Sequence, residues 1–62
     1  MNDEIYQVAT AMEMFGGGFV KALSKALIRA DSDNTQRIKK AFPEYWAKYL
    51  KLYRSDIGEK NE

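Results

Sequence analysis

The chain has 62 residues, a net charge of +1, no cysteine and no histidine, and it holds one Trp, four Tyr and three Phe residues. A chain this short forms one domain and hides only about 60% of the surface that its unfolded state exposes. The missing cysteines exclude disulfides, and the absence of both cysteine and histidine argues against a zinc site. Oligomerisation, partner binding or a core rich in large side chains remain as sources of stability.

The termini and the hydropathy pattern bear on location. No apolar run approaches the roughly 20 residues that cross a bilayer. The first residues, MNDEIYQ, are acidic where a signal peptide is basic. We therefore expect a soluble, cytoplasmic protein that makes no membrane contact.

Charge is distributed unevenly along the chain. Residues 1–20 carry three acidic side chains and no basic one, whereas residues 21–54 hold nine of the ten basic residues. A basic middle segment is typical either of a protein with an anionic partner or of solvated helix faces balanced by acidic ends, and we favour the second.

The first predicted helix runs from Asp3 to Met14. Asn2 is the predicted N-cap, and Asp3 and Glu4 suit the positive end of the helix dipole. Three consecutive glycines, Gly16 to Gly18, then predict a turn. The predicted apolar stripe, at spacings of three and four, consists of Ile5, Val8, Ala9, Met12 and Phe15.

A second amphipathic helix is predicted after the glycines. Its predicted apolar face consists of Phe19, Ala22, Leu23, Ala26, Leu27 and Ala30. Its predicted polar side consists of Lys21, Ser24, Lys25 and Arg29. Ile28 falls on that polar side, which marks it as part of a second contact surface. The polar segment 31–34 ends this helix, and Asp31 or Ser32 is the predicted cap of the next.

Two further helices are predicted. A short one has an apolar edge of Ile38, Ala41 and Phe42. Pro43 disfavours helical backbone at Phe42 and suits the first position of a new helix, so the sequence predicts either a break or a kink there. The last helix runs from Pro43 to about Tyr53. The predicted fold class is therefore all-α, a compact three- to four-helix miniature bundle, with one domain at 1–54 and a polar, frayed tail at 55–62.

The last predicted helix has an apolar arc that covers about half of its circumference. Trp46 and Tyr49 lie at its centre and are the predicted core anchors. The arc is wider than a small core needs, and Tyr and Trp each carry a polar group that favours a rim. We therefore predict a protein interface made of Ile28, Tyr45, Leu50, Leu52 and Tyr53. On this hypothesis the chain is a non-enzymatic interaction module that self-associates as a homo-oligomer, binds a host protein, or does both.

Nucleic-acid binding is the main alternative. Lys21, Lys25 and Arg29 form an i, i+4, i+8 stripe that can contact phosphates. A second basic cluster consists of Arg37, Lys39 and Lys40. No pattern of Arg, Asn or Gln that would read bases accompanies them, and the turns do not specify a helix-turn-helix.

An oligomeric binder of anionic nucleotides is a third hypothesis, in which the amides of Gly16 to Gly18 contact phosphate. No strand precedes the glycines, however, and FGGGFVKAL matches neither GxxxxGK[ST] nor GxGxxG. We therefore favour a tight turn with close helix packing at this point.

Catalysis has little support in the sequence. Asp31 and Asp33 form the closest carboxylate pair in the middle of the chain, but a helix boundary seldom buries such groups enough to shift a pKa. We interpret them as capping residues, with at most a weak, incidental ion site. The sequence predicts no enzyme, no cofactor and no metal.

Three segments, FGGGFVKAL, the turn with Ala30, Asp31 and Asn34, and AFPEYWAKY, resemble a family of short phage and prophage-encoded proteins. That family shows a Gly-Gly-x-Phe element, an Ala-Asp-x-x-Asn turn and an Ala-Phe-Pro-x-x-Trp ending. The resemblance covers about residues 15 to 49. It implies a phage accessory protein or anti-defence factor that acts on a host protein, by class only.

Overall fold

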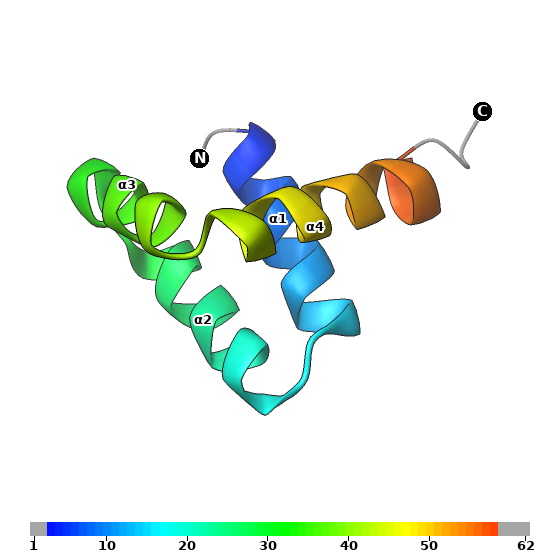
Figure 1. The fold of residues 1–62 in the computed structure, drawn as a ribbon, viewed down its shortest axis with the longest axis horizontal. Helices are drawn as coiled ribbons and strands as arrows, with labels where there is room; N and C mark the ends of the chain where they lie inside the picture. The colour runs from blue at the N-terminus through cyan, green and yellow to red at the C-terminus, as the bar shows by residue number, and fades with distance from the viewer. Residues whose placement is uncertain (1–2, 59–62) are drawn as a thin grey trace.

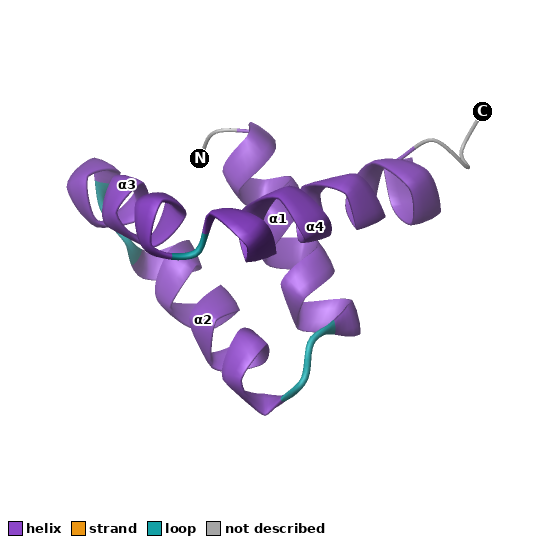
Figure 2. Ribbon diagram, in the orientation of Figure 1, coloured by secondary structure: helices purple, strands orange, loops and turns teal. Residues whose placement is uncertain are grey.

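The computed structural model describes residues 3–58. Its helices are α1 (Asp3–Phe15), α2 (Gly18–Arg29), α3 (Ser32–Ala41) and α4 (Pro43–Tyr53), followed by the π-helical turn η1 (Arg54–Gly58). Only Gly16, Gly17, Ala30, Asp31 and Phe42 lie outside helices in this range (Figure 2). The predicted all-α miniature bundle is confirmed.

The helix α1 is the centre of the molecule. It forms an antiparallel hairpin with α2, and α4 crosses it on another side (Figure 1). The helix α3 makes few contacts with either neighbour. The buried apolar core consists of Val8, Ala9, Ala11 and Met12 from α1, Val20 and Leu27 from α2, and Trp46 and Tyr49 from α4. Because α1 supplies four of these eight buried residues and contacts both α2 and α4, it forms the centre of the core.

Local sequence signals set the helix ends. Asp31 is the N-cap of α3, where its carboxylate accepts a hydrogen bond from the Asn34 amide at 2.8 Å. Pro43 opens α4, and Phe42 has φ −130° and ψ 59°, outside the helical region. The chain therefore breaks at Phe42, which settles the choice between a break and a kink.

Both ends of the chain extend past the described range. The predicted cap Asn2 lies outside the described residues, as do residues 59–62 of the predicted tail. The remainder of that tail, residues 55–58, continues α4 as η1. Among the described helices, none is long and apolar enough to cross a membrane.

The buried face of α2 differs from the predicted one. Ser24, placed on the polar side by its chemistry, is 0% exposed, and its hydroxyl donates to the Ala9 carbonyl oxygen at 2.9 Å. Val20 is also buried, whereas Ala22 and Ala26 are exposed. The helix is rotated so that its small, hydrogen-bonded serine packs closely against α1, a position that a hydropathy pattern does not identify.

Two phenylalanines were also misplaced by the apolar pattern. Phe15 is 44% exposed and Phe19 is 59% exposed. The Phe19 ring instead lies against Phe42 and Tyr45, with ring centroids 5.7 and 6.2 Å away. Phe15 is the last residue of α1 and lies past Met12, the last buried residue of that helix.

Gly16 is the position where the glycine turn requires the absence of a side chain. A Cβ built at Gly16 would lie 2.6 Å from the Met12 carbonyl oxygen and would overlap the Val20 side chain. Nothing lies within 4 Å of a Cβ at Gly17 or Gly18. The close approach of the α1 end to the α2 start therefore depends on one of the three glycines.

We expect Gly16→Ala to destabilise the fold by about 1–3 kcal/mol, because the added methyl group meets backbone that must shift. Gly18→Ala is the matched control. Gly18 is in the first turn of α2 with open space around it, so alanine there should leave stability unchanged or raise it slightly. Urea unfolding measures both changes, and equal effects of the two substitutions would contradict the packing described here.

Candidate interaction surfaces

The predicted interface residues on α4 are largely used inside the molecule. Tyr45, Leu50, Leu52 and Tyr53 are half-buried and pack against the core. Trp46 and Tyr49 are each 5% exposed, which confirms them as core anchors. Consequently α4 offers less free apolar surface than its sequence indicates.

Aromatic rings account for much of this use of α4. The Tyr45 ring stacks on Phe42 with centroids 5.9 Å apart, and it lies 6.4 Å from the Tyr49 ring. Farther along α4, Tyr53 makes an edge-to-face contact with Tyr6 of α1 at 6.3 Å. Such pairs stabilise by about 0.5–1.5 kcal/mol beyond the area they bury. The wide apolar arc of α4 thus packs against α1, α2 and Phe42 at the end of α3.

Free apolar surface is found instead on α1 and α2. Tyr6, Met14 and Ile28 are 55%, 58% and 53% exposed. They border a groove of about 350 Å³ with an almost wholly apolar lining, which we call the α1–α2 groove. The groove is lined by Tyr6, Ala9, Thr10, Glu13, Met14 and Ile28. Of the predicted interface residues, Ile28 therefore lies in this groove, and Tyr53 supports it through the Tyr6 ring.

Tyr6 and Met14 were not identified from the sequence. They lie outside the apolar stripe that forms the core, and a search for one buried face passes over them. Together with Thr10 they occur at i, i+4 and i+8, a second line along the opposite side of the same helix. Two large apolar side chains on that line are the signal that predicts the groove.

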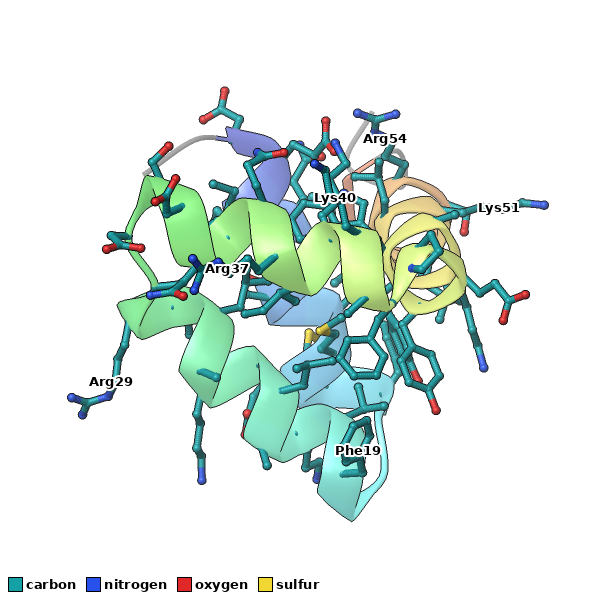
Figure 3. The ribbon with its side chains drawn as sticks, turned by 60° about the vertical axis from the view of Figure 1, so that its left-hand side comes forward. Phe19, Arg29, Arg37, Lys40, Lys51 and Arg54 are labelled. Atoms are coloured by element: carbon teal, nitrogen blue, oxygen red, sulfur yellow. The ribbon has the colours of Figure 1, made fainter. Side chains whose placement is uncertain are left out.

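A second apolar groove, of about 440 Å³, lies between α2 and α3. We call it the α2–α3 groove. It is lined by Ala26, Arg29, Ala30, Asn34, Arg37, Ile38, Ala41 and Phe42. Arg29 and Arg37 come from the two neighbouring helices at the same end of the molecule (Figure 3).

Of the six predicted basic contact residues, five are free of ion pairs among the described residues and one, Lys39, pairs with Glu4. Lys21, Lys25 and Arg29 are exposed along α2, and Arg37 and Lys40 are exposed on α3. Lys39 is withdrawn from this set, because its ammonium group lies 3.3 Å from Glu4 Oε2 and 5.2 Å from the Trp46 ring centre. The remaining five residues are exposed on α2 and α3, and we call them together the basic surface.

Glu4 ties three helices together. Trp46 Nε1 of α4 donates a hydrogen bond to Glu4 Oε2 at 2.6 Å, and Lys39 of α3 donates to the same oxygen. The hydrogen bond from Trp46, followed by that from Lys39, lowers the pKa of the Glu4 carboxyl below its usual value. Glu4, for which the sequence predicts an interaction with the helix dipole, therefore also orients the Trp46 side chain.

The acidic residues singled out in the sequence are not gathered into a metal site in the part of the chain that the structure covers. Asp31 is used as a cap, and no group of three or more acidic residues between 3 and 58 is placed to hold a metal ion. The glycine turn serves close packing at Gly16. The two grooves and the basic surface are features that can contact another molecule.

No protein-family model matches the chain, and neither a curated protein nor a solved structure matches it. The resemblance to short phage-encoded proteins therefore stays a prediction. The functional argument depends on the surfaces themselves.

We expect Glu4→Gln to lower the free energy of unfolding by about 1 kcal/mol at neutral pH, a modest value because the side chain is partly exposed. The folded-state pKa of Glu4 is depressed. Its stabilisation is therefore present above the unfolded-state pKa and is lost as the pH falls through the folded-state pKa.

Urea unfolding of wild type and Glu4→Gln across the acidic range measures this effect, and the two stabilities should converge at low pH. Glu13→Gln is the control, since the Glu13 side chain makes no ion pair or hydrogen bond with the other described residues. A difference between wild type and Glu4→Gln that stays constant with pH would contradict the role given to Glu4.

Proposed function

We propose that the chain is a small protein-interaction module that self-associates through the α1–α2 groove. The observation that carries the proposal is the grouping of Tyr6, Met14 and Ile28, each more than half exposed, along one apolar groove. Contiguous exposed apolar surface on a small soluble domain is typical of an interaction site.

Energetics supports the proposal. Complete burial of one large apolar side chain stabilises by about 1.5–3 kcal/mol. Covering the exposed parts of Tyr6, Met14 and Ile28 would therefore add substantially to the stability of so small a protein. Small domains without disulfides or metals commonly gain stability by association. A second copy supplies such cover without any other component.

The residue types also suit an interface. Tyrosine combines a large apolar ring with a polar hydroxyl, and methionine adapts its shape to a partner. Both are enriched at protein interfaces. Ile28 is thus an interface residue both in the sequence-based hypothesis and in this proposal. The centre of the proposed contact lies on α1 instead of α4, and Tyr53 contributes by packing against Tyr6.

We expect wild-type protein to associate between micromolar and millimolar concentration in analytical ultracentrifugation. The double variant Met14→Gln, Ile28→Gln should bind at least about tenfold more weakly, a loss of roughly 1.4 kcal/mol or more. Glutamine is polar, neutral and a good helix former, so the folded monomer should be preserved.

Ala22→Gln is the matched control, because Ala22 is exposed on α2 and lines neither groove. It should associate like wild type, and circular dichroism checks the helix content of all three proteins. A wild type that stays monomeric at millimolar concentration, or a double variant that associates as tightly as wild type, would contradict the proposal.

A further inference from the structure

The α2–α3 groove is open because α3 makes few contacts with α2. Its apolar lining includes three alanines, Ala26, Ala30 and Ala41, beside Ile38, and we call these four residues its floor. Small side chains let another helix approach closely, at interaxial distances of about 8–10 Å. The groove therefore has the shape and apolarity that suit one face of a helix.

The rim of this groove is cationic. Arg29 and Arg37 are exposed, and neither makes an ion pair with any residue between 3 and 58. The α2–α3 hairpin, residues 18–41, holds six basic and two acidic side chains. A helix that fits this groove should be apolar along its length with carboxylates at its edges.

The outer face of α1 has these properties. It consists of Asp3, Tyr6, Thr10, Glu13 and Met14, and all of these except Asp3 line the α1–α2 groove. Asp3 and Glu13 are exposed, have no ion-pair partner in the described part of the chain, and lie about 15 Å apart along the helix axis. There is no basic residue in α1.

We propose that the outer face of α1 in one copy docks into the α2–α3 groove of a second copy. Tyr6 and Met14 pack on the alanine floor, and the two carboxylates pair with the guanidinium groups of Arg29 and Arg37. This inference rests on the proposed function and specifies which surface the apolar face of α1 meets.

Charge favours this arrangement over a contact between two α1 helices. An antiparallel α1 pair would bring Asp3 of one copy toward Glu13 of the other, and a parallel pair would bring identical acids together. Like charges facing each other are unfavourable, and α1 has no basic residue to compensate. The α2–α3 hairpin, with six basic and two acidic side chains, offers an oppositely charged surface in the same molecule.

Single-stranded nucleic acid fits the groove less well. Phosphates need a cationic path and gain little from an alanine floor. A strand that followed Lys21, Lys25 and Arg29 would also reach the exposed carboxylates of Asp31 and Asp33 at the end of α2. The combination of apolar floor and paired arginines favours the acidic, apolar helix.

The contact is heterologous, because each copy uses two different surfaces. Head-to-tail contacts of this kind form rings when the rotation closes and open chains when it does not. An open assembly always leaves one α1 face and one α2–α3 groove uncovered at its ends. Variants that block a single surface can therefore cap the assembly.

The test mixes two variants in analytical ultracentrifugation, with native mass spectrometry for the stoichiometry. One is the Met14→Gln, Ile28→Gln variant, which keeps the α2–α3 groove. The other is Arg29→Glu, Arg37→Glu, which keeps the outer face of α1. Each alone should associate at least about tenfold more weakly than wild type, and their mixture should form a one-to-one heterodimer and nothing larger.

Lys21→Glu, Lys25→Glu is the matched control, since it makes the same charge change on exposed residues that line neither groove. It should associate like wild type. An arginine variant that self-associates as tightly as wild type would overturn the heterologous contact and leave the proposed function standing, whereas a monomeric wild type would overturn both.

Gel retardation with single-stranded DNA and RNA tests whether nucleic acid binds the basic surface instead. Retardation by wild type that is lost in both charge-reversal variants, with no heterodimer in the mixture, would assign the basic surface to nucleic acid and overturn the inference. Absence of retardation together with the heterodimer supports it.

Discussion

The arrangement of the molecule depends on one face of α1 that must pack against two helices at once. Val8, Ala9, Ala11 and Met12 combine two small and two larger side chains, and all are buried. The small Ala9 lets α2 come close enough for the Ser24 hydroxyl to reach its carbonyl oxygen. Because one face of α1 serves both α2 and α4, the opposite face is left largely uncovered, with Ile28 of α2 and Tyr53 of α4 at its edges. The exposed Tyr6 and Met14 follow directly from this constraint.

The same constraint leaves α3 at the edge of the fold. With α1 flanked by α2 and α4, α3 is joined to the rest of the fold by Ile38, which packs on the core, by the buried Thr35, and by the interaction of Lys39 with Glu4 and Trp46. A helix attached in this way does not close over α2, so the α2–α3 groove remains. The outer face of α1 and the α2–α3 groove are therefore both left uncovered for the same structural reason. Their opposite charges reflect the uneven distribution of charge along the chain.

Much of the fold could be predicted from the sequence, because helix ends and helix periodicity are local properties. The cap at Asp31, the start at Pro43 and the core positions of Trp46 and Tyr49 follow from short-range signals. The rotation of α2 could not be predicted, since burial of Ser24 depends on a carbonyl oxygen fifteen residues away. The candidate surface was only partly predicted. Ile28 could be identified because it is an apolar residue on a polar helix face. The contacts of Phe19 with Phe42 and Tyr45, which cover part of α4, could not be predicted because they join residues far apart in the sequence.

Self-association through the outer face of α1 and the α2–α3 groove is tested most directly by ¹H–¹⁵N spectra of wild type over a range of concentrations. The account predicts concentration-dependent shifts at Tyr6 and Met14 on one surface and at Ala30 and Ile38 on the other. Ala47, exposed on α4 and outside both surfaces, should not change. Spectra that do not vary with concentration, or shifts confined to α4, would contradict it.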